Sequence, residues 1–186
     1  MYQQKDFTHL LGLPGFSDIL LTNHFALYAG YVKNSNLLWE KLDGGVESGS
    51  AEYQELKRRI AWEIDGMRMH ELYFENLTIG KKEIGSKTKE LLEKNFGSIE
   101  NWEKSLVTNC STRGIGWVVL LQDNVTKEVF HAWVGEHNSG HILDCTILLV
   151  IDVWEHAFMT DYGIKRVDYI NAILPVINWE VVEGRL

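Results

Sequence analysis

The chain has 186 residues, of which 45% are hydrophobic and 24% charged, and it contains only two prolines. This composition excludes a disordered, collagenous or low-complexity protein and predicts a globular chain with a substantial core. Acidic residues outnumber basic ones 26 to 18, and the formal net charge of −8 disfavours a nucleic-acid or anionic-membrane surface.

The first half of the chain has the periodicity of helices. Apolar residues recur at helical spacing over 17–42, after a capping signal at Ser17, and a pair of glycines ends the segment. A second long helix is predicted from Ala51 to about Asn76. Because the connection is short, the two segments predict an antiparallel helical hairpin, which we assign to an N-terminal lobe over 1–80.

The amino-acid composition of the second half changes at Arg113, after which β-branched and aromatic residues become frequent. The predicted elements are helices over 81–96 and 98–112, strands over 114–121, 126–134 and 146–151, and helices from 154 onward. We therefore expect a C-terminal α/β lobe over 81–186, with a three-stranded antiparallel sheet flanked by helices. The fold class expected for the whole chain is α+β.

Cysteine content and hydropathy favour a cytoplasmic location. Cys110 and Cys145 are the only cysteines and form no CxxC pair, which fits a reducing compartment. Residues 1–13 lack the apolar core of a secretion signal. The apolar run at 147–151 is far shorter than the roughly 20 residues that span a bilayer, so we expect no membrane contact.

Four side chains form a candidate metal site. Asp152 and His156 lie four residues apart, where an apolar strand gives way to a helix, and both can turn toward one point. His24 and His70 lie one on each long helix. Three imidazoles and a carboxylate suit a first-row metal and leave room for solvent or substrate. The plainer interpretation makes Asp152 a helix cap and each histidine a residue of the core.

The segment from Asp152 to Phe158, DVWEHAF, closely resembles the DxWEHAYY signature of the iron/manganese superoxide dismutases. His70 in HELYF is similar to the NHxxFW histidine of that family, GIGW at 114–117 to its GSGW, and NWE at 178–180 to its NWE. The resemblance covers about 23–182. It implies a helical hairpin followed by a three-stranded α/β lobe, dismutation of superoxide, and one iron or manganese ion per subunit.

The resemblance implies four metal ligands, His24, His70, Asp152 and His156. The family usually has a tyrosine eight residues after its first ligand, whereas Tyr31 lies seven residues after His24. Alignment on Tyr31 would make Asn23 the ligand. We prefer His24 because asparagine is a poor ligand for these metals, and the usual helix can carry one extra residue as a π-bulge.

The family also places a Gln or His against the metal-bound solvent, from one of two chain positions. The first position, four residues before the second ligand, is Gly66 here, and the other, fifteen residues before the aspartate, is His137. The resemblance therefore gives this contact to His137, which would otherwise be an ordinary loop histidine. It makes Tyr31 the gate residue that passes protons. Tyr28 replaces a family histidine and removes a possible proton relay.

The remaining site residues are also implied by the resemblance. Trp117, Trp154 and Phe74 would form an apolar wall that keeps water out, a role compatible with plain core packing. In the family Glu155 reaches a ligand histidine of the partner chain, so it implies a homodimer, which can assemble further into a tetramer. Arg166 corresponds to an arginine near the family's substrate funnel, although a lone arginine is by default a surface charge.

The leading hypothesis is a superoxide dismutase with an antioxidant role and superoxide as its substrate. A metal-binding relative with weak or no dismutase activity, acting in oxidative or metal stress, is the first alternative. It is motivated by Tyr28, the short spacing to Tyr31, and Phe158-Met159 in place of two tyrosines. The second alternative is a helical interaction module whose histidines all belong to the core. The sequence leaves iron and manganese equally open.

Overall fold

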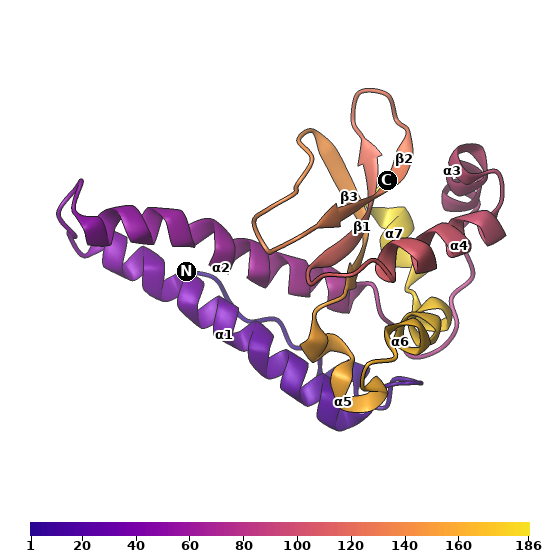
Figure 1. The fold of residues 1–186 in the computed structure, drawn as a ribbon, viewed down its shortest axis with the longest axis horizontal. Coiled ribbons are helices and arrows are strands. Elements are labelled where there is room, and N and C mark those ends of the chain that lie inside the picture. Colours follow the sequence, from indigo (N-terminus) through magenta and orange to yellow (C-terminus); the bar gives the residue numbers. More distant parts are fainter.

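A computed structural model describes all residues from 1 to 186. Its N-terminal part is a hairpin of two long antiparallel helices, α1 (Asp18–Asp43) and α2 (Ala51–Glu75) (Figure 1). Ser17 and Ser50 cap the two helices, each accepting a hydrogen bond from the backbone N–H three residues later. The helical hairpin predicted from the sequence is confirmed.

The first seventeen residues form an arm that packs on this hairpin. Apart from a short 3-10 helix, Thr8–Leu10, the arm has no regular structure. Phe7 is buried, and its ring lies 4.9 Å from that of Phe74 on α2. The arm thereby closes one side of the helical hairpin against solvent.

The C-terminal part combines helices with one small sheet, as the sequence predicts. Its elements are α3 (Ser86–Phe96), α4 (Ile99–Cys110), β1 (Trp117–Asp123), β2 (Val129–Val134), β3 (Cys145–Asp152), α5 (Met159–Tyr162), α6 (Arg166–Ile173) and α7 (Trp179–Gly184). The sheet is antiparallel with the order β2-β1-β3. At one end of the central strand, Trp117 at the start of β1 pairs with Asp152 at the end of β3.

Several element boundaries differ from the expected ones. The helix expected from residue 81 begins only at Ser86, because Gly85 before it is extended and a carboxylate of α7, that of Glu183, accepts a hydrogen bond from the N–H of Thr88. The strand expected from residue 114 begins at Trp117. Gly114 and Gly116 have φ angles of 142° and 131°, which keep this stretch out of the sheet.

One cluster of buried apolar side chains extends from the N-terminal arm through the helical hairpin and sheet to α7. None of the helices combines the length and apolarity needed to cross a bilayer. The division into lobes at residue 80 stays a prediction. The elements that matter for the site are α1, α2 and the end of β3, which meet where the hairpin approaches the sheet (Figure 1).

Candidate metal centre

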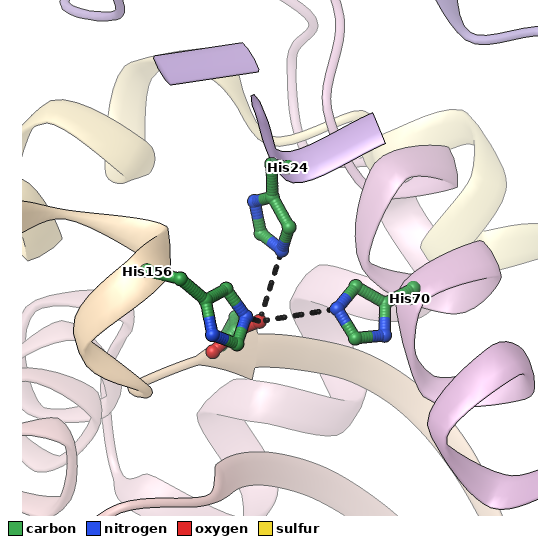
Figure 2. Close-up of side chains that lie close together, drawn as sticks. His24, His70 and His156 are labelled. Carbon is green, nitrogen blue, oxygen red and sulfur yellow. Dashed lines mark hydrogen bonds and ion pairs between the residues drawn. The ribbon is translucent and has the colours of Figure 1, made fainter. Parts of the chain in front are cut away.

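The structure brings the four candidate ligands together. His24 comes from α1, His70 from α2, Asp152 from the last position of β3, and His156 from a short 3-10 helix, Glu155–Ala157. One ligand atom from each lies within 4.8 Å of the others. Figure 2 shows the three imidazole rings directed at a single carboxylate.

The distances within this cluster converge on one oxygen. Oδ2 of Asp152 lies 3.1 Å from Nε2 of His24, 3.2 Å from Nε2 of His156 and 3.9 Å from Nε2 of His70. Three of the four side chains are fully buried, whereas that of His156 is 25% exposed. The cluster is therefore almost closed to solvent and reaches the surface on the His156 side.

The hydrogen bonds of His70 show that the cluster suits a cation. Its Nδ1 lies 2.6 Å from the carbonyl oxygen of Gly66, one turn earlier on α2. Because a carbonyl only accepts, Nδ1 carries the proton and donates it, and Nε2 presents a lone pair to the cluster. This Nε2 atom is buried without a hydrogen-bond partner. A metal ion would satisfy it, and three nitrogens with one carboxylate oxygen match iron or manganese.

The charges of the cluster favour the same occupant. Burial opposes ionisation of Asp152, but His156 and His24 outweigh it and hold the pKa of this carboxyl well below its usual range. Burial lowers the pKa of the His24 imidazole and, more strongly, that of His70. Burial opposes the charge of His156 too, but the Asp152 carboxylate outweighs it and raises the pKa of that imidazole. The ionised carboxylate and the neutral imidazoles of His24 and His70 are in the protonation state that a metal ion requires of its ligands, and a metal ion would take the place of the proton on His156.

Backbone and side-chain hydrogen bonds fix the position of Asp152. Its Oδ1 accepts a hydrogen bond from the N–H of Trp154 at 2.8 Å, and its carbonyl oxygen accepts one from the hydroxyl of Tyr169 at 2.7 Å. The hydroxyl of Tyr73 lies 3.0 Å from that of Tyr169. Sequence reasoning missed this buried tyrosine pair, because the two residues are 96 positions apart and share no pattern.

His137 and Tyr31 form a second group beside the cluster. Nε2 of His137 lies 2.7 Å from the hydroxyl of Tyr31, and its Nδ1 lies 3.2 Å from Nε1 of Trp117. The indole N–H only donates, so Nδ1 of His137 accepts. Burial lowers the pKa of His137 to about 4, and the neutral ring therefore carries its proton on Nε2 and donates to Tyr31.

Gly66 provides the space for this pair. A Cβ atom at position 66 would lie 2.7 Å from the ring of Tyr31 and 3.2 Å from that of His137. The ring of Tyr31 stacks on His70 with 5.1 Å between centroids. In the regular helix α1, seven residues make almost two turns, so Tyr31 shares the face of His24 despite the unusual spacing.

Aromatic rings enclose the cluster. Trp117 lies edge-on to His70 with 5.0 Å between centroids, and Phe74 lies 4.8 Å from His24. Trp154 stacks on His137 at 5.0 Å. Sequence analysis did not single out Trp62 of α2, whose ring lies 4.6 Å from that of His137. Its helical position gave no signal, because His137 comes from a distant loop.

Tyr28 has its polar contacts elsewhere. Its buried hydroxyl donates to Oε1 of Glu71 at 2.9 Å and accepts from the backbone N–H of Lys5 at 2.9 Å. Burial raises the pKa of this hydroxyl to about 12. The side chain thus links α1 to α2 and to the N-terminal arm, and its hydroxyl makes no hydrogen bond to the four clustered residues.

Arg166 and Glu155 lie beside a groove on the protein surface. The guanidinium of Arg166 donates to the carbonyl oxygens of Thr112 and Gly114, both at 2.8 Å, and contacts no member of the cluster. Glu155 is exposed and lines a surface groove with Arg166. The apolar side chains of that groove include Phe158, Met159 and Ile164.

Comparison with known proteins agrees with this architecture. The family model described as iron/manganese superoxide dismutases, C-terminal domain, matches residues 84–185, more than half of the chain. The chain belongs to the iron/manganese superoxide dismutase family. The resemblance read from its motifs is thereby confirmed, and so is the α+β fold that the family implies.

Several curated superoxide dismutases match nearly the whole chain. The superoxide dismutase [Fe] of Saccharolobus solfataricus is 31% identical over 177 residues, which cover 91% of this chain and 84% of that protein. The superoxide dismutase [Fe] of Aquifex pyrophilus is 32% identical over an alignment 192 residues long, which covers 98% of this chain and 90% of that protein. Superoxide dismutase [Mn] 2 of Haloferax volcanii is 28% identical over 175 residues, covering 92% and 87%.

Proposed function

We propose that this protein is a superoxide dismutase that holds one iron or manganese ion per chain. His24, His70, Asp152 and His156 would hold the ion. The observation that carries this proposal is the lone pair of His70 Nε2, buried without a partner and directed at an ionised carboxylate. The relatives named above, which include both iron and manganese enzymes, support it.

A metal ion held by His24, His70, Asp152 and His156 would supply one-electron chemistry, by which one superoxide is oxidised to dioxygen and a second is reduced, with two protons, to hydrogen peroxide. The chain contributes ligand geometry. The carbonyl oxygen of Gly66 accepts a hydrogen bond from Nδ1–H of His70 and so orients the imidazole ring. The backbone N–H of Trp154 donates to the carboxylate of Asp152 and holds it in the same way. These contacts fix both ligands before the metal arrives and lower the cost of ordering the site.

Tyr31 would donate protons to the product, and His137 would orient its hydroxyl group. The Nε2–H of His137 points at the oxygen of Tyr31, so the hydroxyl proton of Tyr31 is free to be donated elsewhere. Burial raises the pKa of Tyr31 to about 12, so the hydroxyl stays protonated at neutral pH. Tyr31 is also partly exposed and can regain a proton from solvent. It is therefore suited to deliver protons to the nascent peroxide.

Trp117, Phe74 and Trp154 would exclude bulk water. Their rings pack directly against His70, His24 and His137. Removing water strengthens the interaction of the buried carboxylate with a cation, because the local dielectric constant falls. The same packing belongs to the core, so these rings serve stability and the site together.

We further propose that the protein acts as a cytoplasmic antioxidant homodimer. Glu155 is exposed beside an apolar groove, and an exposed carboxylate next to Phe158, Met159 and Ile164 suits a self-complementary interface. Across the twofold axis, Glu155 would accept a hydrogen bond from a ligand histidine of the second copy. That contact would cover the partly exposed His156.

Metal analysis combined with a dismutation assay tests the function. We expect the protein expressed in iron- or manganese-supplemented medium to hold about one ion per chain and to dismutate superoxide far faster than the free ion does. His156→Ala should lose most of both properties. A metal-loaded protein no faster than free ion would overturn the enzyme assignment and favour a metal-binding relative without useful activity.

A further inference from the structure

Arg59 of α2 lies close to the Tyr31 and His137 pair. Its Nε donates to Oε1 of Glu63 at 2.9 Å, and its guanidinium lies over the ring of Trp62, 5.1 Å from the centroid. The side chain of Arg59 is 43% exposed, whereas that of Glu63 is only 5% exposed. The ion pair therefore presents its cation to solvent and its carboxylate to the interior.

The two η nitrogens of the Arg59 guanidinium are free to bind an anion. Only Nε has a hydrogen-bond partner, and neither η nitrogen makes a hydrogen bond within the chain. The second oxygen of Glu63 accepts a hydrogen bond from Nδ2 of Asn34 at 3.4 Å. Arg59 is thus anchored on one side and offers two N–H donor groups to an anion on the other.

Trp62 connects Arg59 to the proton-handling pair. Its ring lies 4.6 Å from that of His137 and 6.2 Å from that of Trp154. The charge of Arg59 also reaches the pair: burial has the largest effect on the pKa of Tyr31 and of His137, and Arg59 lowers both. Its field therefore acts on the Tyr31 side of the cluster.

The other two arginines of α2 are already paired with carboxylates. Arg58 makes two hydrogen bonds of 2.7 Å to Glu55, and Arg68 donates to Glu71. Arg166 is held by two backbone carbonyls. A protein of net charge −8 repels an anion at long range, and salt screens that field over about 8 Å, so capture depends on a nearby cation.

We propose that Arg59 guides superoxide to the Tyr31 side of the metal centre. The free η nitrogens attract the anion, the flat face of Trp62 holds the guanidinium in place, and the buried Glu63 anchors it. This inference rests on the proposed dismutase function. Arg59 acts on the encounter with the substrate and takes no part in the electron transfer itself.

The test compares Arg59→Gln with Arg58→Gln. Each variant removes one positive charge from neighbouring positions of α2, and glutamine at position 59 can still donate to Glu63. We expect Arg59→Gln to lower kcat/KM for superoxide at low salt on the order of three-fold and to flatten its dependence on ionic strength. Arg58→Gln should keep the wild-type rate and salt slope. Equal effects of the two variants would overturn the proposal.

Binding of azide to the iron- or manganese-loaded protein gives a readout that needs no turnover. Azide is a small anion, so its apparent Kd at low salt should rise in Arg59→Gln and stay unchanged in Arg58→Gln. An unchanged Kd in both would overturn the role of Arg59 even if the enzyme is active. Conversely, loaded wild-type protein no faster than free ion would overturn the dismutase assignment, and the azide comparison would still judge Arg59.

Two further variants distinguish a loss of charge from a loss of folding. Arg59→Gln leaves a buried carboxylate without its cation, which can destabilise α2. The double variant Arg59→Gln/Glu63→Gln removes both charges and should show the same loss of salt dependence. Arg59→Lys retains the charge and should stay close to wild type. A double variant with the wild-type salt slope would contradict the proposal.

Discussion

The ring of Tyr31 occupies the space that a side chain at Gly66 would need, with only 2.7 Å between the ring and the position of a Cβ atom. The glycine therefore has a steric role. It allows α2 to approach α1 closely enough for Tyr31 to reach both His70 and His137.

Gly66→Ala should displace Tyr31 and weaken its hydrogen bond to His137. We expect a loss of about 1–3 kcal/mol in the free energy of unfolding, as for other overpacked sites. Dismutation should fall on the order of ten-fold, because proton delivery is impaired.

Gly30→Ala on α1 is the matched control: nothing lies within 4 Å of its Cβ position, so helix propensity should raise stability by up to about 1 kcal/mol. Thermal unfolding and dismutation rates of Gly66→Ala and Gly30→Ala test this explanation. Equal changes in stability and rate in the two variants would refute the steric role of Gly66.

Adjacent residues on α1 separate the two possible alignments of the first ligand. His24 is fully buried in the cluster, whereas Asn23 is exposed. His24→Ala should reduce the metal content well below one ion per chain, because one imidazole is lost and the Asp152 carboxylate loses a partner. Asn23→Ala should retain the metal. Elemental analysis of the purified proteins measures both, and metal loss confined to Asn23→Ala would reverse the assignment.

Glu155→Ala should weaken the proposed dimer. Removing one partner of a charge-assisted contact at an interface leaves the other without compensation, so we expect the dimer dissociation constant to rise at least ten-fold. Sedimentation over a range of concentrations measures this constant. Glu47→Ala, in the turn between α1 and α2, is a control for the lost charge and should leave the constant unchanged. A Glu155→Ala protein that dimerises like wild type would count against this interface.

His131 predicts a pH dependence of stability that is independent of the metal centre. Burial lowers its pKa from the ordinary 6.5 to about 4. Between these values the unfolded chain binds a proton at this residue and the folded chain does not, so stability is present above pH 6.5 and falls as the pH decreases toward 4. The slope contributed is at most about 1.4 kcal/mol for each pH unit.

The variant His131→Gln should flatten this part of the stability curve. Nδ1 of His131 lies 2.9 Å from the hydroxyl of Ser105, and glutamine can replace that contact. The difference between wild-type and variant unfolding free energies, measured by denaturant titration from pH 7 to pH 4, isolates this residue from the other histidines. Parallel curves for the two proteins would show that His131 does not carry the dependence.

Local patterns carried most of the fold prediction. Helix periodicity and the capping signal at Ser17 are properties of contiguous residues, and the bounds they gave for α1 and α2 lie within one or two positions of the observed ones. The pair Asp152 and His156 was also recognisable, because four residues at a strand end suffice to bring both side chains to one point. The start of α3 was misplaced because a carboxylate from the far end of the chain, Glu183, decides it.

Contacts between distant segments were not predictable in the same way. Tyr169 holds the backbone of Asp152 and lies beside the hydroxyl of Tyr73, yet the HELYF segment that contains Tyr73 gives no sign of Tyr169. Arg59 looks like any charged residue of an exposed helix face until Trp62 is seen against His137. The family resemblance suggested Arg166 for the substrate funnel, but a resemblance does not show that Thr112 and Gly114 occupy its donors.

The origin of the four clustered side chains sets an order of events during biosynthesis. His24 and Asp152 are separated by 128 positions, and the carboxylate comes from the final strand. A chain that has emerged from the ribosome only as far as α2 displays two imidazoles and no carboxylate. The proposed set of donors is complete only once β3 has joined the sheet and the segment Glu155–Ala157 has folded beside it, so a metal held by these four side chains would be bound fully only by a chain whose synthesis is almost finished.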